Sequence, residues 1–122
     1  MRKISKKSIR NKCDNLWKEI IHQKGHCEVC GRTDTLNAHH IIGRINKRLR
    51  WDIRNGCLLC ASCHRLSKFS AHNDSQEFMK WFEEKRPVDY RYVEQKKHEI
   101  SRNIDYEEIL EKLKEVKGNL LK

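Results

Sequence analysis

The chain has 122 residues, and its 27 Lys and Arg against 17 Asp and Glu give a formal net charge of +10. A chain of this length forms one small domain with a limited core, which a bound metal ion would help to stabilise. No stretch approaches the roughly 18 consecutive apolar residues that span a bilayer, so we expect no membrane partner. The charge favours a polyanion, nucleic acid above all, over the alternative of a basic protein with no such ligand.

The positive charge lies in the first two thirds of the sequence. Residues 1–24 have a net charge of +6, residues 25–72 of +5 and residues 73–122 of −1. The basic start is followed by polar residues rather than by an apolar run, which is unlike a secretory signal and predicts a cytoplasmic protein. In a reducing compartment, six cysteines are more often metal ligands or buried thiols than disulfides.

Residues 1–24 read as a basic arm that runs into a helix ending near Gly25. The apolar residues at helical spacing, expected to dock on the core, are Ile9, Cys13, Leu16, Trp17, Ile20 and Ile21. Cys13 lies on this face, which predicts a buried thiol rather than a ligand. The basic side chains that either contact phosphate or remain solvated are Arg2, Lys3, Lys6, Lys7, Arg10 and Lys12.

Two Cys-x-x-Cys pairs flank the middle of the chain. Cys27 and Cys30 form the first, and we assign Cys60 and Cys63 to the second. Cys57 is also three residues from Cys60, but a strand-to-helix turn suits the later pair, which leaves Cys57 as a small buried residue. Four thiolates make a closed tetrahedral site for a structural Zn²⁺, and a redox role for the pairs is the alternative.

Between the pairs, the pattern predicts a ββα unit with strands over residues 36–42 and 55–59 and a helix over residues 61–69. Side chains alternate along a strand, so His39 and His40 should point to opposite faces. His39 and His64 could then hold a second ion with open positions, while neutral His40 accepts a proton from water. Asn55 would hold the hairpin or orient His40. Taken singly, each histidine is more readily explained as a core or surface residue, and only the spaced set indicates a site.

The segment joining the two strands, residues 43–54, is rich in cations and long enough to suggest a functional loop. We expect it to bind phosphates of nucleic acid together with a cation of the following helix, the residues being Arg44, Lys47, Arg48, Arg50, Arg54 and Lys68. Trp51 either stacks on a base or fills the core, and its shared parity with Ile53 favours the core.

The last third of the chain is predicted to be helical. One helix should cover residues 75–85, capped by Asn73 and Asp74 and ended by Pro87. Two more are expected over residues 90–100 and from about 103 to 120, packed on the core, on each other or on a second copy. The fold class is therefore α+β, with a basic arm and helix (1–24), a zinc-stapled ββα core (25–72) and a helical extension (73–122).

The order of these residues resembles the HNH nucleases, a branch of the ββα-metal (His-Me finger) endonucleases, over about residues 25–70. The resemblance implies a metal-dependent DNA endonuclease in which His39 and His64 are metal ligands, His40 is the general base and Asn55 supports the site. Many members have Asp where His39 stands, and some have another His where this chain has Lys68, with His72 a weak substitute. Mg²⁺, Mn²⁺, Ni²⁺ and Zn²⁺ are all candidates for the catalytic ion, and nitrogen ligands disfavour Mg²⁺.

Residues 49–55, followed by a Cys-x-x-Cys pair, are similar to phage recombination nucleases of the lambda NinG/Rap type. That shorter resemblance implies a nuclease encoded by a phage or mobile element and acting in the host cytosol. Two rival hypotheses stay open: a non-catalytic zinc finger that binds nucleic acid, and a subunit of a phage packaging or recombination complex. In the second, the C-terminal helices would bind another phage protein or form a homodimer.

Overall fold

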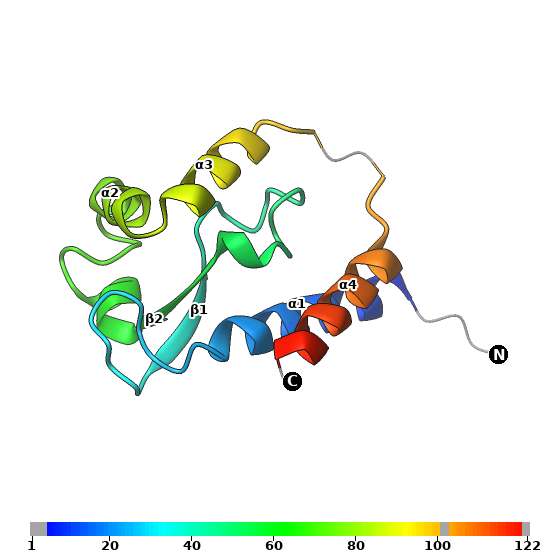
Figure 1. Ribbon diagram of the computed structural model, residues 1–122, viewed down its shortest axis with the longest axis horizontal. Helices are drawn as coiled ribbons and strands as arrows, with labels where there is room; N and C mark the ends of the chain where they lie inside the picture. The colour runs from blue at the N-terminus through cyan, green and yellow to red at the C-terminus, as the bar shows by residue number, and fades with distance from the viewer. Residues whose placement is uncertain (1–4, 101–102, 121–122) are drawn as a thin grey trace.

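A two-stranded antiparallel hairpin lies between two pairs of helices in the computed structural model, which describes residues 5–100 and 103–120 (Figure 1). The elements are α1 (Lys6–His22), β1 (Leu36–His40), β2 (Gly56–Cys60), α2 (Ser75–Lys85), α3 (Pro87–Lys96) and α4 (Tyr106–Leu120). α1 and α4 lie side by side, and α2 and α3 lie on the other side of the hairpin. The predicted α+β class is confirmed. None of the helices in the described ranges is long and apolar enough to cross a membrane.

The pairing of the strands separates the two adjacent histidines. His39 pairs with Cys57 and His40 with Gly56. Side chains alternate across the sheet, so the His39 ring faces Phe78 of α2 at 5.2 Å, while the His40 ring lies 4.0 Å from that of Trp17 of α1. The opposite orientations expected from the sequence are therefore present.

Helix α1 is packed directly against the hairpin. Its first turn is capped by Ser5, whose Oγ accepts a hydrogen bond from Ser8 N at 3.1 Å. A Cβ atom on Gly56 would lie 2.2 Å from Ile21 Cδ1, so only glycine allows the helix to approach this closely. Arg2 and Lys3 of the expected basic arm lie outside the described residues.

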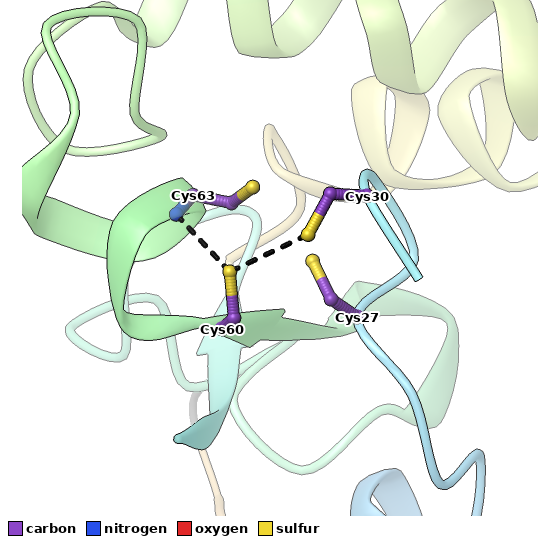
Figure 2. Close-up of side chains that lie close together, drawn as sticks. All are labelled: Cys27, Cys30, Cys60 and Cys63. Carbon is purple, nitrogen blue, oxygen red and sulfur yellow. Dashed lines mark hydrogen bonds between the residues drawn. The ribbon is translucent and has the colours of Figure 1, made fainter. Parts of the chain in front are cut away.

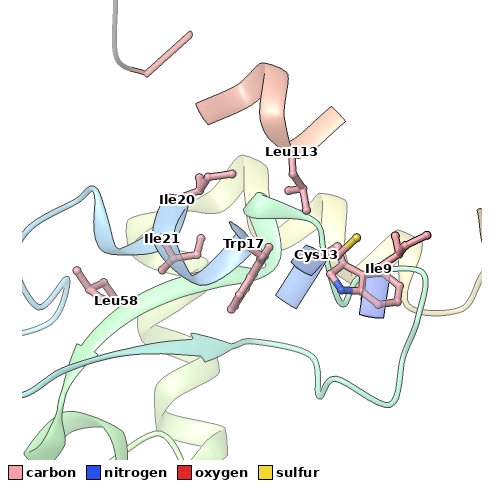
Figure 3. Packing of buried hydrophobic residues seen from close by; sticks show 8 residues of the cluster. Ile9, Cys13, Trp17, Ile20, Ile21, Leu58 and Leu113 are labelled. Atoms are coloured by element: carbon pink, nitrogen blue, oxygen red, sulfur yellow. The ribbon is translucent and has the colours of Figure 1, made fainter. Parts of the chain in front are cut away.

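Helix α4 covers the outer side of α1 and completes the first core cluster. Figure 3 shows Leu113 of α4 above a row of α1 side chains that reaches Leu58 on β2. Lys117 Nζ donates to Glu19 Oε2 at 2.6 Å along the same contact. Cys13 is fully buried there, and Trp51 belongs to the same cluster, in agreement with the core roles predicted for both. The C-terminal helix thus packs on the core of its own chain.

Helices α2 and α3 form the other side of the fold. Asp74 caps α2 by accepting a hydrogen bond from Glu77 N at 3.1 Å, as predicted. Phe82 of α2, Val93 of α3 and Leu49 of the loop form a buried cluster. The prediction of a helix over residues 90–100 was shifted: α3 begins at Pro87 and ends at Lys96, because proline is well suited to the first helical turn, where its missing N–H is not needed.

The predicted helix over residues 61–69 is shorter than expected. The chain forms a π-helical turn, Ser62–Leu66, and Ser67 is extended. It then folds back on itself, because Ala71 N donates to Cys63 O at 2.8 Å and His72 N donates to His64 O at 3.1 Å. This return matters for the site, since it brings His72 beside His64.

Candidate metal centre and catalytic site

The four cysteines of the two Cys-x-x-Cys pairs converge at one end of the hairpin. Figure 2 shows Cys27 and Cys30 on the turn before β1 facing Cys60, the last residue of β2, and Cys63 in the turn that follows. Their sulfur atoms all lie within 4.8 Å of one another, and Cys30 Sγ lies 3.6 Å from Cys60 Sγ. Thiolates around a tetrahedral Zn²⁺ at about 2.3 Å are separated by about 3.8 Å, so the cluster fits a closed structural site.

The surroundings of Cys27 favour its thiolate form, whereas burial and the neighbouring thiols raise the pKa of Cys63. Burial opposes a charge on Cys27, but backbone N–H groups of Cys30, Cys60 and Val29 outweigh it and lower the pKa of its thiol to about 7. Gly31, at φ +81°, closes the first turn, where Gly31 N donates to Cys27 O at 2.9 Å. A thiol with a low pKa loses its proton readily to a metal ion, which is what zinc binding requires.

Cys57 lies apart from the cluster. It is fully buried on β2, and burial together with the Glu28 carboxylate raises the pKa of its thiol. A neutral, buried thiol behaves as a small apolar side chain. The geometry therefore favours Cys60 and Cys63 as the second pair.

A second cluster consists of three histidines. His39 on β1, His64 in the turn after β2 and His72 at the end of the returning loop each present a ring nitrogen, and these atoms all lie within 4.8 Å of one another. The ring centroids of His64 and His72 are 4.5 Å apart, and both rings lie about 5 Å from that of His39. Nitrogen ligands at about 2.1 Å from a tetrahedral ion are about 3.4 Å apart, so small side-chain movements would bring all three onto one ion.

The electrostatics of the cluster keep these rings neutral. Burial, reinforced by the neighbouring histidines, lowers the pKa of His39 to about 3. Burial, His72 and Arg65 lower that of His64 to about 4, and burial and Arg65 also lower that of His72. Neutral imidazole is the form that binds metal ions. His39 is buried and His72 is exposed, so an ion here would be reached from solvent on the His72 side.

His40 is held in a defined ring orientation on the other face of β1. Its ring stacks on Trp17 with an interplanar angle of 7°, and its Nε2 lies 2.9 Å from Arg50 O. A carbonyl oxygen only accepts hydrogen bonds, so Nε2 carries the proton and Nδ1 keeps a free lone pair. Burial lowers the pKa of His40, which leaves the ring neutral near pH 7. A neutral, oriented imidazole of this kind can accept a proton.

Asn55 is fully buried and ties the loop of residues 41–54 to the hairpin. Its Oδ1 accepts a hydrogen bond from Ile42 N at 2.8 Å, and its Nδ2 donates to Ile42 O at 3.0 Å and to Leu49 O at 3.2 Å. These bonds leave its side chain with partners in the loop rather than in the histidine cluster. Asn55 thus holds Leu49, and the carbonyl oxygen of the next residue, Arg50, binds His40.

No pattern in the sequence indicates the role of Asp14 in α1. Its carboxylate accepts hydrogen bonds from Arg50 Nε at 3.0 Å, from Arg50 Nη2 at 2.7 Å and from Trp51 Nε1 at 2.8 Å. Trp17, one helical turn later, donates from Nε1 to Asp52 O at 2.9 Å. The hydrogen bonds of Asp14 and Trp17 therefore hold residues 50–52 against α1, and we call this set of bonds the clamp. It fixes the position of Arg50 O, which binds His40.

The cations that were expected to bind nucleic acid have different environments. Arg44, Lys47, Arg54 and Lys68 are exposed, and Arg48 is partly exposed and lies 3.7 Å from Glu99. Arg50 is only 9% exposed and its guanidinium is paired with Asp14. Its position favours a structural role over phosphate binding. Arg65, which the prediction left out, is exposed beside the histidine cluster, and its place directly after His64 is the signal that could have identified it.

The chain was compared with known protein families. Residues 27–69 match a family model described as HNH endonuclease. A search of curated proteins and a search of solved structures give no match. The matched segment begins at Cys27, the first residue of the cysteine cluster, and includes His39, His40, Asn55 and His64.

Proposed function

We propose that the protein is a metal-dependent DNA endonuclease that hydrolyses phosphodiester bonds, because residues 27–69 match the HNH endonuclease family model. The observation that carries the proposal is the convergence of the ring nitrogens of His39, His64 and His72 within 4.8 Å. The adjacent residue of β1, His40, has an oriented ring on the other face of the strand. Phosphodiester hydrolysis needs a proton acceptor for the attacking water and positive charge at the phosphate, and these groups supply both.

Each residue has a distinct part in this proposal. A divalent ion bound by His39, His64 and His72 would supply the positive charge that polarises the phosphate and stabilises the leaving oxygen. His40 accepts the proton of the attacking water at Nδ1, because Nε2 already donates to Arg50 O. Asn55 holds the loop in place. The three nitrogen ligands favour Mn²⁺, Ni²⁺ or Zn²⁺ over Mg²⁺ as the ion. Cys27, Cys30, Cys60 and Cys63 would bind a separate structural Zn²⁺.

DNA is the substrate that an HNH domain implies, and the exposed cations support it. Arg44, Lys47, Arg54 and Lys68 can neutralise phosphates, with a dependence of affinity on salt that reflects the number of contacts. The products would be 5′-phosphate and 3′-hydroxyl ends. The short resemblance of residues 49–55 supports a phage or mobile-element origin as part of the same proposal.

The test is cleavage of supercoiled plasmid with Mg²⁺, Mn²⁺ or Ni²⁺ by the wild type, His40→Ala and a matched His98→Ala control on an exposed position. We expect nicking by the wild type and the control, and a loss of at least about 100-fold in His40→Ala, as for removal of a general base. Equal nicking by all three would refute the assignment of His40. A protein that binds one Zn²⁺, binds DNA and never cleaves it would instead be the non-catalytic zinc finger.

A further inference from the structure

The loop of residues 65–71 presents apolar side chains to solvent next to the histidine cluster. It begins directly after His64 and ends directly before His72, and the backbone bond from His72 N to His64 O closes its base at 3.1 Å. Leu66 is 78% exposed and Phe69 is 70% exposed. Burial of these two large apolar side chains would stabilise the fold, so their exposure on one short loop is unusual. It suggests a surface that binds another molecule.

The loop is held in a defined conformation. Asn73 Nδ2 donates to Arg65 O at 2.8 Å and to Ser67 O at 2.9 Å, and Ser67 N donates to Ser62 O at 2.9 Å. Ser70 and Ala71, the last two residues of the loop, are buried. The exposure of Leu66 and Phe69 is therefore a property of an ordered loop, whose backbone groups are bonded within the fold.

The position of the loop limits what these side chains can reach. Leu66 is two residues from His64, and Phe69 is three residues from His72, so their Cα atoms lie within about 7 Å and about 11 Å of those ligands. Successive nucleotides of one DNA strand are about 3.4 Å apart along the axis, so this reach corresponds to two or three base steps. A phosphate bound at the histidines would place its neighbouring bases near the loop.

The charges around the loop fit a nucleic acid better than a second copy of the chain. Arg65 and Lys68 are exposed on the same loop, and Lys68 Nζ lies 5.8 Å from the centre of the Phe69 ring. Cations combined with an exposed aromatic ring are typical of surfaces that bind phosphates and stack on unpaired bases. Two copies meeting at this loop would bring like charges together.

We propose that Phe69 stacks on an unpaired base next to the scissile phosphate and that Leu66 packs against the neighbouring base. This inference rests on the proposed endonuclease function. The protein then favours DNA whose bases are already unstacked, such as a bulge or a mismatch. An intact duplex must first be opened, which costs free energy that a bulged one does not require. The substrate class is thus DNA with locally unpaired bases.

The test measures binding rather than cleavage. In a His40→Ala background, the affinity for a fully paired duplex is compared with that for the same duplex carrying a three-nucleotide bulge, with 2-aminopurine in the bulge reporting stacking. The variants are Phe69→Ala, Phe69→Trp, Leu66→Ala and the control Val88→Ala, which truncates an exposed apolar residue on α3.

We expect the parent and the Val88→Ala control to bind the bulged duplex at least about 10-fold more tightly than the paired one, with a change in 2-aminopurine fluorescence. Phe69→Ala should lose this preference, Leu66→Ala should reduce it and Phe69→Trp should keep it. Equal affinity of the parent for both duplexes, or an unchanged preference in Phe69→Ala, would overturn the inference.

The outcomes separate this inference from the endonuclease proposal. If the wild type cleaves plasmid but Phe69→Ala changes neither preference nor fluorescence, only the loop assignment fails. If Phe69 carries the preference and no cleavage occurs with any ion, the base-binding surface stands and the endonuclease proposal fails. If gel filtration shows a dimer that Phe69→Ala converts to a monomer, the loop joins two copies and the inference is overturned.

Discussion

Replacing Asp14 by Asn removes the negative charge that faces Arg50 inside the fold. The side chains of Asp14 and Arg50 are 18% and 11% exposed, and Arg50 Nη2 lies 2.7 Å from Asp14 Oδ2. The amide of Asn can keep one acceptor, but it leaves a nearly buried guanidinium without its counter-charge. Removing one partner of a buried ion pair lowers the free energy of unfolding by about 3–5 kcal/mol. Because both side chains are partly exposed and the Asn oxygen can still accept a hydrogen bond, we expect a loss of about 2–3 kcal/mol.

Thermal unfolding measures this loss, which for a chain of this size corresponds to about 10 °C in Tm. The matched control is Asp34→Asn, whose carboxylate is 71% exposed and pairs with Arg32. An exposed pair contributes about 0–1 kcal/mol, so the control should unfold close to the wild type. An Asp14→Asn protein with the Tm of the control would refute the stabilising role of the clamp.

The difference in Tm between the wild type and Asp14→Asn should depend on pH in a defined direction. Burial raises the pKa of Asp14, but the hydrogen bonds from Arg50 and Trp51 and the charge of Arg50 outweigh it and lower the pKa below its usual value. The stability that Asp14 contributes is therefore fully present above the unfolded pKa of about 3.9 and is lost only as the pH falls through the lower folded value. The gap in Tm between wild type and Asp14→Asn should be constant from pH 8 to pH 6.

The catalytic consequence follows from the hydrogen bond between His40 and Arg50 O. Loss of the clamp loosens residues 50–52, and we expect kcat for plasmid nicking to fall about 10-fold with little change in KM, as for other groups that orient a functional ring. A folded Asp14→Asn protein with wild-type kcat would show that the clamp does not position His40.

Three further predictions concern the packing and the zinc site. Gly56→Ala should lower the free energy of unfolding by about 1–3 kcal/mol in urea denaturation, because its Cβ would overlap Ile21, and an unchanged midpoint would contradict the close packing of α1 on β2. Asn55→Ala should lose about 3 kcal/mol by the same assay, since three loop backbone groups lose their partner, and a loss below 1 kcal/mol would argue against this role. Removal of Zn²⁺ by a chelator should reduce the ellipticity in circular dichroism, because the turns that carry the four cysteines lose their metal ion. Cys57→Ala should bind as much Zn²⁺ per chain as the wild type, and a loss of Zn²⁺ relative to the wild type would reverse the choice of ligands.

The residues that carry local patterns were predictable from the sequence. Cys-x-x-Cys spacing brings two thiols together within one turn, and strand alternation separates His39 from His40 whatever the rest of the chain does. The caps at Ser5 and Asp74 and the positive φ of Gly31 likewise depend on a few neighbouring residues. Such features need no knowledge of the tertiary fold.

The contacts that complete the site depend on long-range packing. Asp14 meets Arg50 across 36 residues, and no periodicity in either segment indicates that pairing. His72 joins His64 only because the chain turns back after Leu66, where a helix was expected. Arg50 resembled the exposed cations of its loop in sequence, and only the burial of the loop against α1 distinguishes it.

The most direct test of the central claim is a Mn²⁺ titration of plasmid nicking by protein whose structural Zn²⁺ is retained. If His39, His64 and His72 bind the ion that supports cleavage, His72→Ala should need at least about 10-fold more Mn²⁺ for half-maximal nicking, since loss of a ligand weakens the site at least as much as loss of a supporting group. His40→Ala should stay at least about 100-fold slower than the wild type at every Mn²⁺ concentration. Superimposable titration curves for the wild type and His72→Ala, or full nicking by His40→Ala at saturation, would contradict the account.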